Sequence, residues 1–249
     1  MARALPRGTR RRRIRCFAAV DRGLVRASNQ DAAFARWRDG AAVLAVADGM
    51  GGLPAGERAS ALVIAAFEGW PRPDEAAEGW LRDGLERARV AVAADVAAHP
   101  ERARMGSTVV VAVVRDGHAW IAHAGDSRAY RWRGSALEPL TQDHSLAGEA
   151  VRAGLLDASV ARHSPGRHML TRAIGAPDST ADFAGPLALD ADAVLLLVTD
   201  GVSGVLDERE IASAVATRRG AAIARALIER VHAAGAPDNA GIALLDCRE

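Results

Sequence analysis

The sequence contains no lysine, only two cysteines and no long hydrophobic run. Its 32 basic residues are all arginines and are balanced by 31 acidic residues, so its net charge of +1 argues against a nucleic-acid or membrane-surface binder. Cys16 and Cys247 are too few for a disulfide framework or a zinc site, which indicates a reducing, cytoplasmic compartment. The longest apolar stretches have the length of strands, so no membrane span is expected. The basic N-terminus lacks the apolar segment of a signal peptide.

The length of 249 residues and the hydrophobic fraction of 49% suffice for one large domain or two small ones. Residues 1–15 include seven arginines and are predicted to form a disordered tail, with electrostatic docking to an acidic partner as the alternative. No Pro/Gly/Ser-rich linker divides the rest of the chain. Residues 16–249 are therefore expected to form one domain.

Hydrophobic periodicity and turn residues predict strands and helices that come in blocks along the chain. Strands are expected at Cys16–Val20, Ala41–Ala47, Ser107–Val114, His118–His123, Ala129–Trp132, Ala193–Thr199 and Gly241–Leu245. Helices are expected at Ala55–Phe67, from a cap at Asp74 to about Ala98, at Ser145–Ala153, and from Asp207 and about Arg219. Adjacent hairpins, such as the one turned by Asp116-Gly117, favour antiparallel sheets flanked by helices, which is an α+β class.

Two predicted strands end in an aspartate followed by glycine. The run AAVLAVA leads directly into Asp48-Gly49, and AVLLLVT leads directly into Asp200-Gly201. A buried strand fixes the backbone, so each carboxylate is held rigidly where the strand ends, and glycine permits close approach to the main chain. Each pair alone is typical of an ordinary turn. The three glycines within residues 48–52 instead indicate a backbone crowded against a ligand.

Further aspartates lie beside other predicted strand ends, at Asp31, Asp126 and Asp238. Several carboxylates cannot share a small site without cations that offset their repulsion, and oxygen ligands suit Mg²⁺ or Mn²⁺. Such a multi-cation centre suits phosphate hydrolysis, because two metals can activate a bridging water for attack without a serine or cysteine nucleophile. Arg26 is the candidate for gripping the phosphate, although a solvated surface arginine is the alternative.

Six motifs in series resemble those of one known family. They are Gly23-Leu24-Val25-Arg26-x-x-Asn29-Gln30-Asp31, Asp48-Gly49-Met50-Gly51-Gly52, Gly125-Asp126-Ser127-Arg128, Thr141-x-Asp143-His144-Ser145, Thr199-Asp200-Gly201 and Asp238-Asn239. Each motif alone is weak, but their order and spacing over nearly all of residues 16–249 resemble the metal-dependent protein phosphatases of type 2C, in their compact bacterial form.

The resemblance implies a four-layer α-β-β-α sandwich of two antiparallel sheets between helix pairs. It implies a phosphatase for phosphoserine and phosphothreonine that uses two or three Mg²⁺ or Mn²⁺ ions. The implied site residues are Asp48 as bridging ligand with the Gly49 carbonyl, Asp200 and Asp238 on the second metal, Asp126 with Asp200 on a third, Asp31 through water, and Arg26 on the phosphate. Residues 145–180 fall where the family has a variable flap beside the active site.

Three positions depart from the pattern of some members. Gln30 replaces a glutamate, and Met50 replaces a histidine proposed as general acid, as in many bacterial relatives. His144 and His163 are candidates for protonating the leaving group, although a structural role is favoured for each. Gly241 stands where a threonine is usual, which is expected to loosen the last turn but to leave the ligand Asp238 intact.

Two other functions are compatible with parts of this pattern. A pseudophosphatase would keep the fold as a binding module, but the acid set is complete. A two-metal nuclease is disfavoured by the balanced charge. The expected partners are phosphorylated proteins, among them a serine/threonine kinase or its targets. The enzyme is expected to be a monomer. The segment His168-x-Leu170-Thr171-Arg172-Ala173-Ile174-Gly175 resembles relatives encoded beside type VI secretion genes, and anti-sigma-factor pathways are a further setting.

Overall fold

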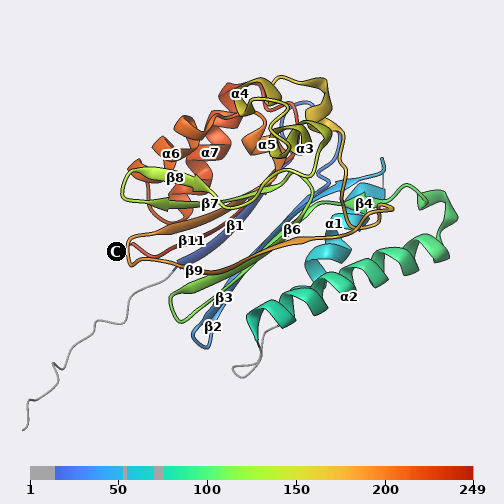
Figure 1. The fold of residues 1–249 in the computed structure, drawn as a ribbon, viewed down its shortest axis with the longest axis horizontal. Helices are drawn as coiled ribbons and strands as arrows, with labels where there is room; N and C mark the ends of the chain where they lie inside the picture. Colours follow the sequence, from blue (N-terminus) through green and yellow to red (C-terminus); the bar gives the residue numbers. More distant parts are fainter. Residues whose placement is uncertain (1–14, 53–54, 70–75, 249) are drawn as a thin grey trace, which may run out of the picture.

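Two antiparallel sheets pack face to face in the computed structural model, which describes residues 15–52, 55–69 and 76–248 (Figure 1). The first sheet has the order β1-β11-β10-β7-β8, with bounds Arg15–Asp21, Ala240–Asp246, Val194–Val198, Arg128–Arg133 and Ala136–Pro139. The second has the order β2-β3-β5-β6-β9, with bounds Asp31–Arg38, Ala41–Met50, Val109–Arg115, His118–Ala124 and Asp182–Ala188. The short strand β4 (Gly106–Ser107) pairs with the end of β3.

Helices cover the outer face of each sheet (Figure 1). The second sheet packs against α1 (Ala55–Ala65) and α2 (Ala77–Ala98), and the first against α6 (Glu208–Thr217) and α7 (Ala221–Ala233). The remaining helices are α3 (Leu146–Arg152), α4 (Ala158–Ala161), α5 (Asp200–Ser203), and the 3₁₀ turns η1 (Pro100–Arg102) and η2 (Pro165–His168). The predicted four-layer α-β-β-α architecture is confirmed.

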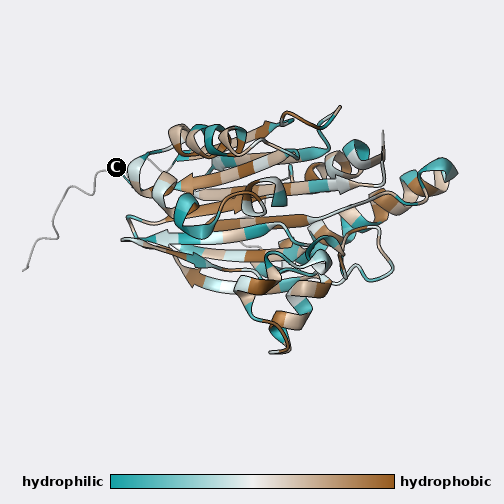
Figure 2. Ribbon diagram, turned by 90° about the horizontal axis from the view of Figure 1, so that it is seen from above, coloured by the Kyte–Doolittle hydropathy of each residue, from teal (hydrophilic) through white to brown (hydrophobic). Residues whose placement is uncertain are grey.

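The apolar run in β3 follows from burial on both faces of its sheet. Val43 and Ala45 face the helix layer, whereas Leu44 and Val46 face the other sheet. The same alternation in β10 sends Leu196 toward α6 and α7, with its neighbours pointing between the sheets. Figure 2 shows these central strands as hydrophobic. Both faces of β3 and β10 are buried in close-packed side chains, so the ends of these strands are held in fixed positions. The residues next to the strand ends are held in place with them.

Helices α6 and α3 begin directly after the capping residues from which they were predicted to start. Asp207 accepts from the Glu210 N–H, and Glu210 reaches back to the Asp207 N–H, which forms a complete capping box at α6. Ser145 caps α3 through the Gly148 N–H. The predicted cap at Asp74 and the predicted tail, apart from Arg15 at the start of β1, lie outside the described residues.

Some strands differ from the predictions. Residues 31–38, 136–139 and 182–188 form β2, β8 and β9, which the apolar pattern did not reveal because these strands are only partly buried. The predicted strand Ala41–Ala47 continues to Met50, because Gly49 and Met50 pair with β4. Asp48 therefore lies inside β3 and not after its end.

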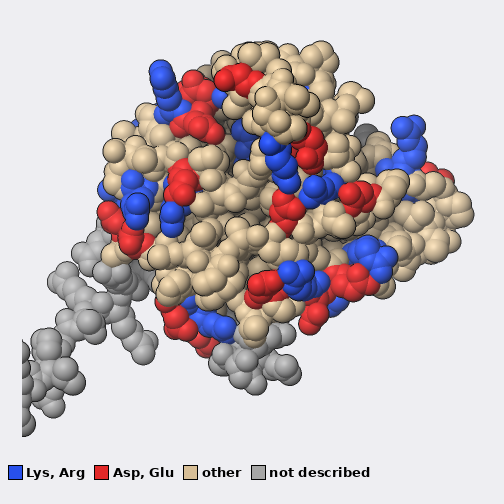
Figure 3. Space-filling view, in the orientation of Figure 1, with Lys and Arg blue, Asp and Glu red and all other residues tan. Residues whose placement is uncertain are grey.

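The face drawn in Figure 3 shows arginines intermixed with acidic residues and no broad patch of one sign. In the described part of the chain, no helix combines the length and the hydropathy that are needed to cross a membrane.

The helix-facing core of the first sheet predicts a large stability effect. Leu196 is fully buried opposite Tyr130 and packs in the cluster beneath α6 and α7. We expect Leu196→Ala to lower the free energy of unfolding by about 2–5 kcal/mol, because a cavity adds to the lost transfer energy. Denaturant unfolding of this variant and of Leu155→Ala, which removes an 81% exposed side chain, measures the effect. Equal losses in the two variants would contradict this account of the core.

Candidate metal centre

Five aspartates that are far apart in the sequence converge at one end of the two sheets. Asp31 opens β2 and pairs in register with Asp48 of β3. Asp126 occupies the turn from β6 to β7, Asp200 begins α5 directly after β10, and Asp238 precedes β11. Asp48, Asp126 and Asp200 each offer a carboxylate oxygen, and these oxygens all lie within 4.8 Å of one another. The structure therefore brings the predicted acids together.

The backbone of Asp48 is held by hydroxyl groups. The Asp48 N–H donates to Thr108 Oγ1 at 3.0 Å, and the Thr108 N–H donates to the Asp48 carbonyl at 2.9 Å. Thr108 Oγ1 also shares a hydrogen bond of 2.7 Å with Ser127 Oγ, next to Asp126. The predicted strand Ser107–Val114 is interrupted at Thr108 by these contacts. No local sequence pattern predicted a role for this threonine.

Gly49 is required by the chain's own packing. A Cβ at this position would lie 1.9 Å from the Gly56 carbonyl oxygen, and the Gly49 N–H donates to the Gln30 carbonyl at 3.1 Å. The predicted backbone crowding is present. At Gly49 the crowding groups are the start of α1 and the loop before β2, and not the ligand that the glycine-rich motif predicted.

Thr199 links Asp31 to the last strand. Its Oγ1 donates to Asp31 Oδ2 at 2.7 Å and accepts from the Gly241 N–H at 2.7 Å. A Cβ at Gly241 would lie 3.0 Å from Thr199 Cγ2 and 3.3 Å from Asp31 Oδ2, so glycine leaves room for this contact. The threonine hydroxyl thereby connects β2, β10 and β11 at the acid cluster.

Asn239 ties the loop that carries Arg26 to the same cluster. Its amide donates to the carbonyls of Arg22 and Ser28 at 2.8 and 2.9 Å, and its oxygen accepts from the Gln30 N–H at 2.8 Å. These hydrogen bonds connect the turn before β11 to the loop that carries Arg26. Arg26 Nη2 contacts Asp238 Oδ2 at 2.6 Å, and its side chain is 54% exposed.

The acid cluster is electrostatically strained. Burial raises the pKa of Asp31 to about 7, and burial also raises the pKa of Asp48, Asp126 and Asp200 above the ordinary carboxyl range. The charge of Asp200 adds to this rise in the pKa of Asp48 and Asp126, and the charge of Asp238 adds to it in Asp200. Divalent cations would relieve this repulsion, and an all-oxygen donor set fits Mg²⁺ or Mn²⁺.

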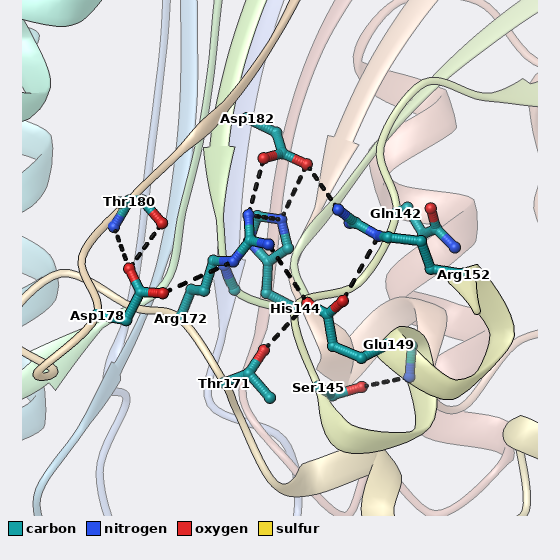
Figure 4. Close-up of polar contacts among 12 residues, drawn as sticks. Gln142, His144, Ser145, Glu149, Arg152, Thr171, Arg172, Asp178, Thr180 and Asp182 are labelled. Atoms are coloured by element: carbon teal, nitrogen blue, oxygen red, sulfur yellow. Dashed lines mark hydrogen bonds and ion pairs between the residues drawn. The ribbon is translucent and has the colours of Figure 1, made fainter.

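A second group with metal-ligand atoms surrounds His144 (Figure 4). The His123 and His144 rings stack at 4.5 Å and 17°, so their nitrogen lone pairs run nearly parallel and do not converge on one ion. Arg172 donates to Asp182 at 2.8 Å and lies 3.4 Å from His144 Nε2, where it would repel a cation. We therefore interpret this group as a structural network that fastens residues 145–180 to β9.

Neither of the predicted candidates, His144 and His163, is the histidine that contacts the acid cluster. His168 Nδ1 lies 3.9 Å from Asp200 Oδ2. His144 is fully buried, and burial lowers its pKa, in agreement with a structural role. Among the described residues, no side-chain hydrogen bond or ion pair joins His163 to the cluster. Spacing along the chain could not reveal His168, because the fold of residues 145–180 brings it there.

Comparisons with known proteins agree with this geometry. A family model described as protein phosphatase 2C matches residues 25–238. The serine/threonine protein phosphatase PstP of Mycobacterium tuberculosis is 34% identical over 237 residues, which are 94% of this chain and 45% of PstP. This chain thus spans less than half the length of that relative.

Two solved structures superpose closely. The catalytic domain of PstP, in complex with two manganese ions, matches with a TM-score of 0.81 and 32% identity, over 94% of this chain and 97% of that one. PppA, described as a key regulatory component of the T6SS in Pseudomonas aeruginosa, matches with a TM-score of 0.78 and 30% identity, over 94% and 97% of the two chains.

The raised pKa of Asp31 predicts a pH dependence of stability in metal-free protein. Its carboxyl has a pKa of about 7 in the folded chain, above its unfolded value, so its contribution is fully present in acid and lost as the pH rises through about 7. In the presence of a chelator, we expect the wild type to lose a few kcal/mol of unfolding free energy relative to Asp31→Asn between about pH 5 and pH 8.

Denaturant unfolding across this pH range measures the difference. Asp83→Asn, at an exposed position on α2, is the matched control and should follow the wild type at every pH. A difference between wild type and Asp31→Asn that stays constant with pH, or grows in favour of the wild type, would contradict the assignment.

Proposed function

The chain belongs to the protein phosphatase 2C family, and we propose that it is a metal-dependent phosphatase that hydrolyses phosphoserine and phosphothreonine in proteins. The observation that carries this proposal is the convergence of Asp48, Asp126 and Asp200, whose carboxylate oxygens lie within 4.8 Å of one another. Asp31 is paired in register with Asp48, and Asp238 contacts Arg26 beside them. The manganese ions in the structure of PstP support the same chemistry. A pseudophosphatase would not need so strained a set of acids.

We assign the metal ligands within this cluster. Asp48, the Gly49 carbonyl, Asp200 and Asp238 would hold two Mg²⁺ or Mn²⁺ ions, and Asp126 would hold a third with Asp200. Asp31, which Thr199 engages on one oxygen, would act through water. Bound divalent cations lower the pKa of water to supply the nucleophile and offset the charge of the phosphoryl group. The β-strand ends and their hydroxyl contacts keep the carboxylates in place.

Arg26 would bind the phosphate. Its guanidinium lies against Asp238, and contact with that carboxylate raises its pKa further, so it carries a full positive charge at the rim of the cluster. A guanidinium can donate two parallel hydrogen bonds to phosphoryl oxygens. Asn239 holds the loop that presents it. The arginine therefore orients the phosphoryl group toward the carboxylates.

We infer that the substrates are proteins phosphorylated by a serine/threonine kinase, or the kinase itself, and that the enzyme acts as a monomer in the cytoplasm. The low cysteine content supports that compartment. Residues 145–180 would serve as the flap beside the active site, since His168 brings them to Asp200. The similarity to PppA supports regulation of type VI secretion as a second possible role, besides the reversal of kinase signalling. A kinase gene or a secretion gene cluster next to the gene for this chain would distinguish these two roles.

Replacement of the central ligand tests the metal assignment. We expect Asp48→Asn to lower kcat by at least roughly a hundredfold, because changes to groups that merely support a metal ligand already cost ten- to a hundredfold. Hydrolysis of para-nitrophenyl phosphate and of a phosphothreonine peptide with Mn²⁺ measures the loss, and circular dichroism checks the fold. Asp83→Asn is the matched control. Near-normal turnover by Asp48→Asn would exclude Asp48 as a ligand.

Replacement of Arg26 tests substrate binding separately. We expect Arg26→Ala to raise KM for the phosphothreonine peptide roughly tenfold or more with kcat little changed, because a charge-assisted hydrogen bond to the phosphate is lost. Arg225→Ala, at an exposed site on α7, should leave both constants unchanged. An unchanged KM in Arg26→Ala, or a loss confined to kcat, would remove Arg26 from the phosphate site.

A further inference from the structure

His168 brings the segment 145–180 into contact with the acid cluster. It is the last residue of η2, its side chain is 60% exposed, and its Nδ1 lies 3.9 Å from Asp200 Oδ2. This distance is longer than a hydrogen bond, so the ring nitrogen faces the carboxylate without being fully engaged by it. An exposed ring at the edge of an acid cluster is accessible to a ligand that binds there.

The hydrogen bonds of the ring determine which nitrogen is the donor. Arg167 Nε donates to His168 Nε2 at 2.8 Å, and Arg167 Nη1 donates to the Arg162 carbonyl at 2.7 Å. Because an arginine can only donate, Nε2 must be the acceptor, and the ring hydrogen is on Nδ1. The ring thus directs an N–H group toward Asp200.

The stretch that follows His168 is anchored by hydrogen bonds. The Met169 carbonyl, next to it, accepts from the Leu146 N–H of α3 at 2.9 Å, and the Thr171 N–H donates to the His144 carbonyl at 2.9 Å. Arg172 then fastens this stretch to Asp182 of β9 (Figure 4). The histidine is therefore presented by an anchored segment, although its side chain is exposed.

His168 and Arg26 are related in one respect. Each is a donor that faces a carboxylate assigned to metal binding, Arg26 at Asp238 and His168 at Asp200, and the two come from different segments of the chain. Cations held by these carboxylates would offset their negative charge and so weaken their attraction for the two donors. A phosphoryl group that binds at the cluster supplies the replacement oxygens.

We propose that His168 is a second phosphate-binding residue, which donates its Nδ1–H to a phosphoryl oxygen of the substrate or of the phosphate product. This inference rests on the proposed phosphatase function. It gives the segment 145–180 a direct contact with the group that is hydrolysed. The ligand class is a phosphate monoester or inorganic phosphate.

Three variants test this role in the full chain with Mn²⁺. His168→Ala removes the donor, His168→Asn places an amide N–H near the position of Nδ1–H, and His163→Ala is the matched control within the same segment, at an exposed position. The measured quantities are the inhibition constant of inorganic phosphate, KM for the phosphothreonine peptide, and the Mn²⁺ concentration for half-maximal activation.

We expect His168→Ala to raise the phosphate inhibition constant and KM about three- to tenfold, the range for loss of one hydrogen bond. The Mn²⁺ requirement should stay the same, His168→Asn should recover most of the loss, and His163→Ala should match the wild type. An unchanged phosphate inhibition constant in His168→Ala would overturn the proposal. A higher Mn²⁺ concentration for half-maximal activation, with an unchanged phosphate inhibition constant, would also overturn the proposal. That result would mean that His168 positions Asp200 for metal binding.

The outcome can be separated from failure of the proposed function. If the Mn²⁺-loaded wild type hydrolyses neither substrate, the phosphatase proposal fails. Calorimetric titration of inorganic phosphate into the same protein then still tests His168. Weaker binding by His168→Ala than by wild type and His163→Ala supports the phosphate contact, and equal binding excludes it.

Discussion

Repulsion among the buried carboxylates at one end of the sandwich is the constraint on which the rest of the site depends. Burial and mutual repulsion raise the pKa of Asp48, Asp126 and Asp200, so ionising them together costs free energy that the fold must supply or a cation must offset. A chain selected only for stability would place such groups in solvent. Their convergence is therefore best understood as preparation for cations.

Hydrogen bonds from neutral side chains hold the acids and the neighbouring loop in place against this repulsion. Thr108 grips the backbone of Asp48, Thr199 engages Asp31, and Asn239 holds the loop of Arg26. None of these groups neutralises charge, so they fix positions without replacing the cations. Preorganised ligands of this kind lower the cost of ordering the site when metal binds, because strands buried on both faces already hold their ends still.

The strand-end pattern allowed much of this to be predicted. Asp126 and Asp200 follow the ends of β6 and β10, whereas Asp31 and Asp238 lie at or just before the starts of β2 and β11, and the antiparallel topology brings these ends to one edge. Asp48 was expected directly after the end of its strand but lies inside β3, since the pairing of Gly49 and Met50 with a separate two-residue strand cannot be read from local periodicity. The Thr108 hydroxyl was missed for a similar reason. Its partner lies 60 residues away, and only the tertiary fold brings the two together.

The position of the segment 145–180 could not be predicted from the sequence. Its helices are short, its apolar pattern is weak, and its position depends on the ion network around Arg172 and Asp182 (Figure 4). That network is anchored on β9, whereas Arg26 is anchored through Asn239 near β11. The two donors that face the cluster are thus carried by independent supports. Residues around His168 can therefore vary, and change how substrates are held, without disturbing the carboxylates that hold the cations.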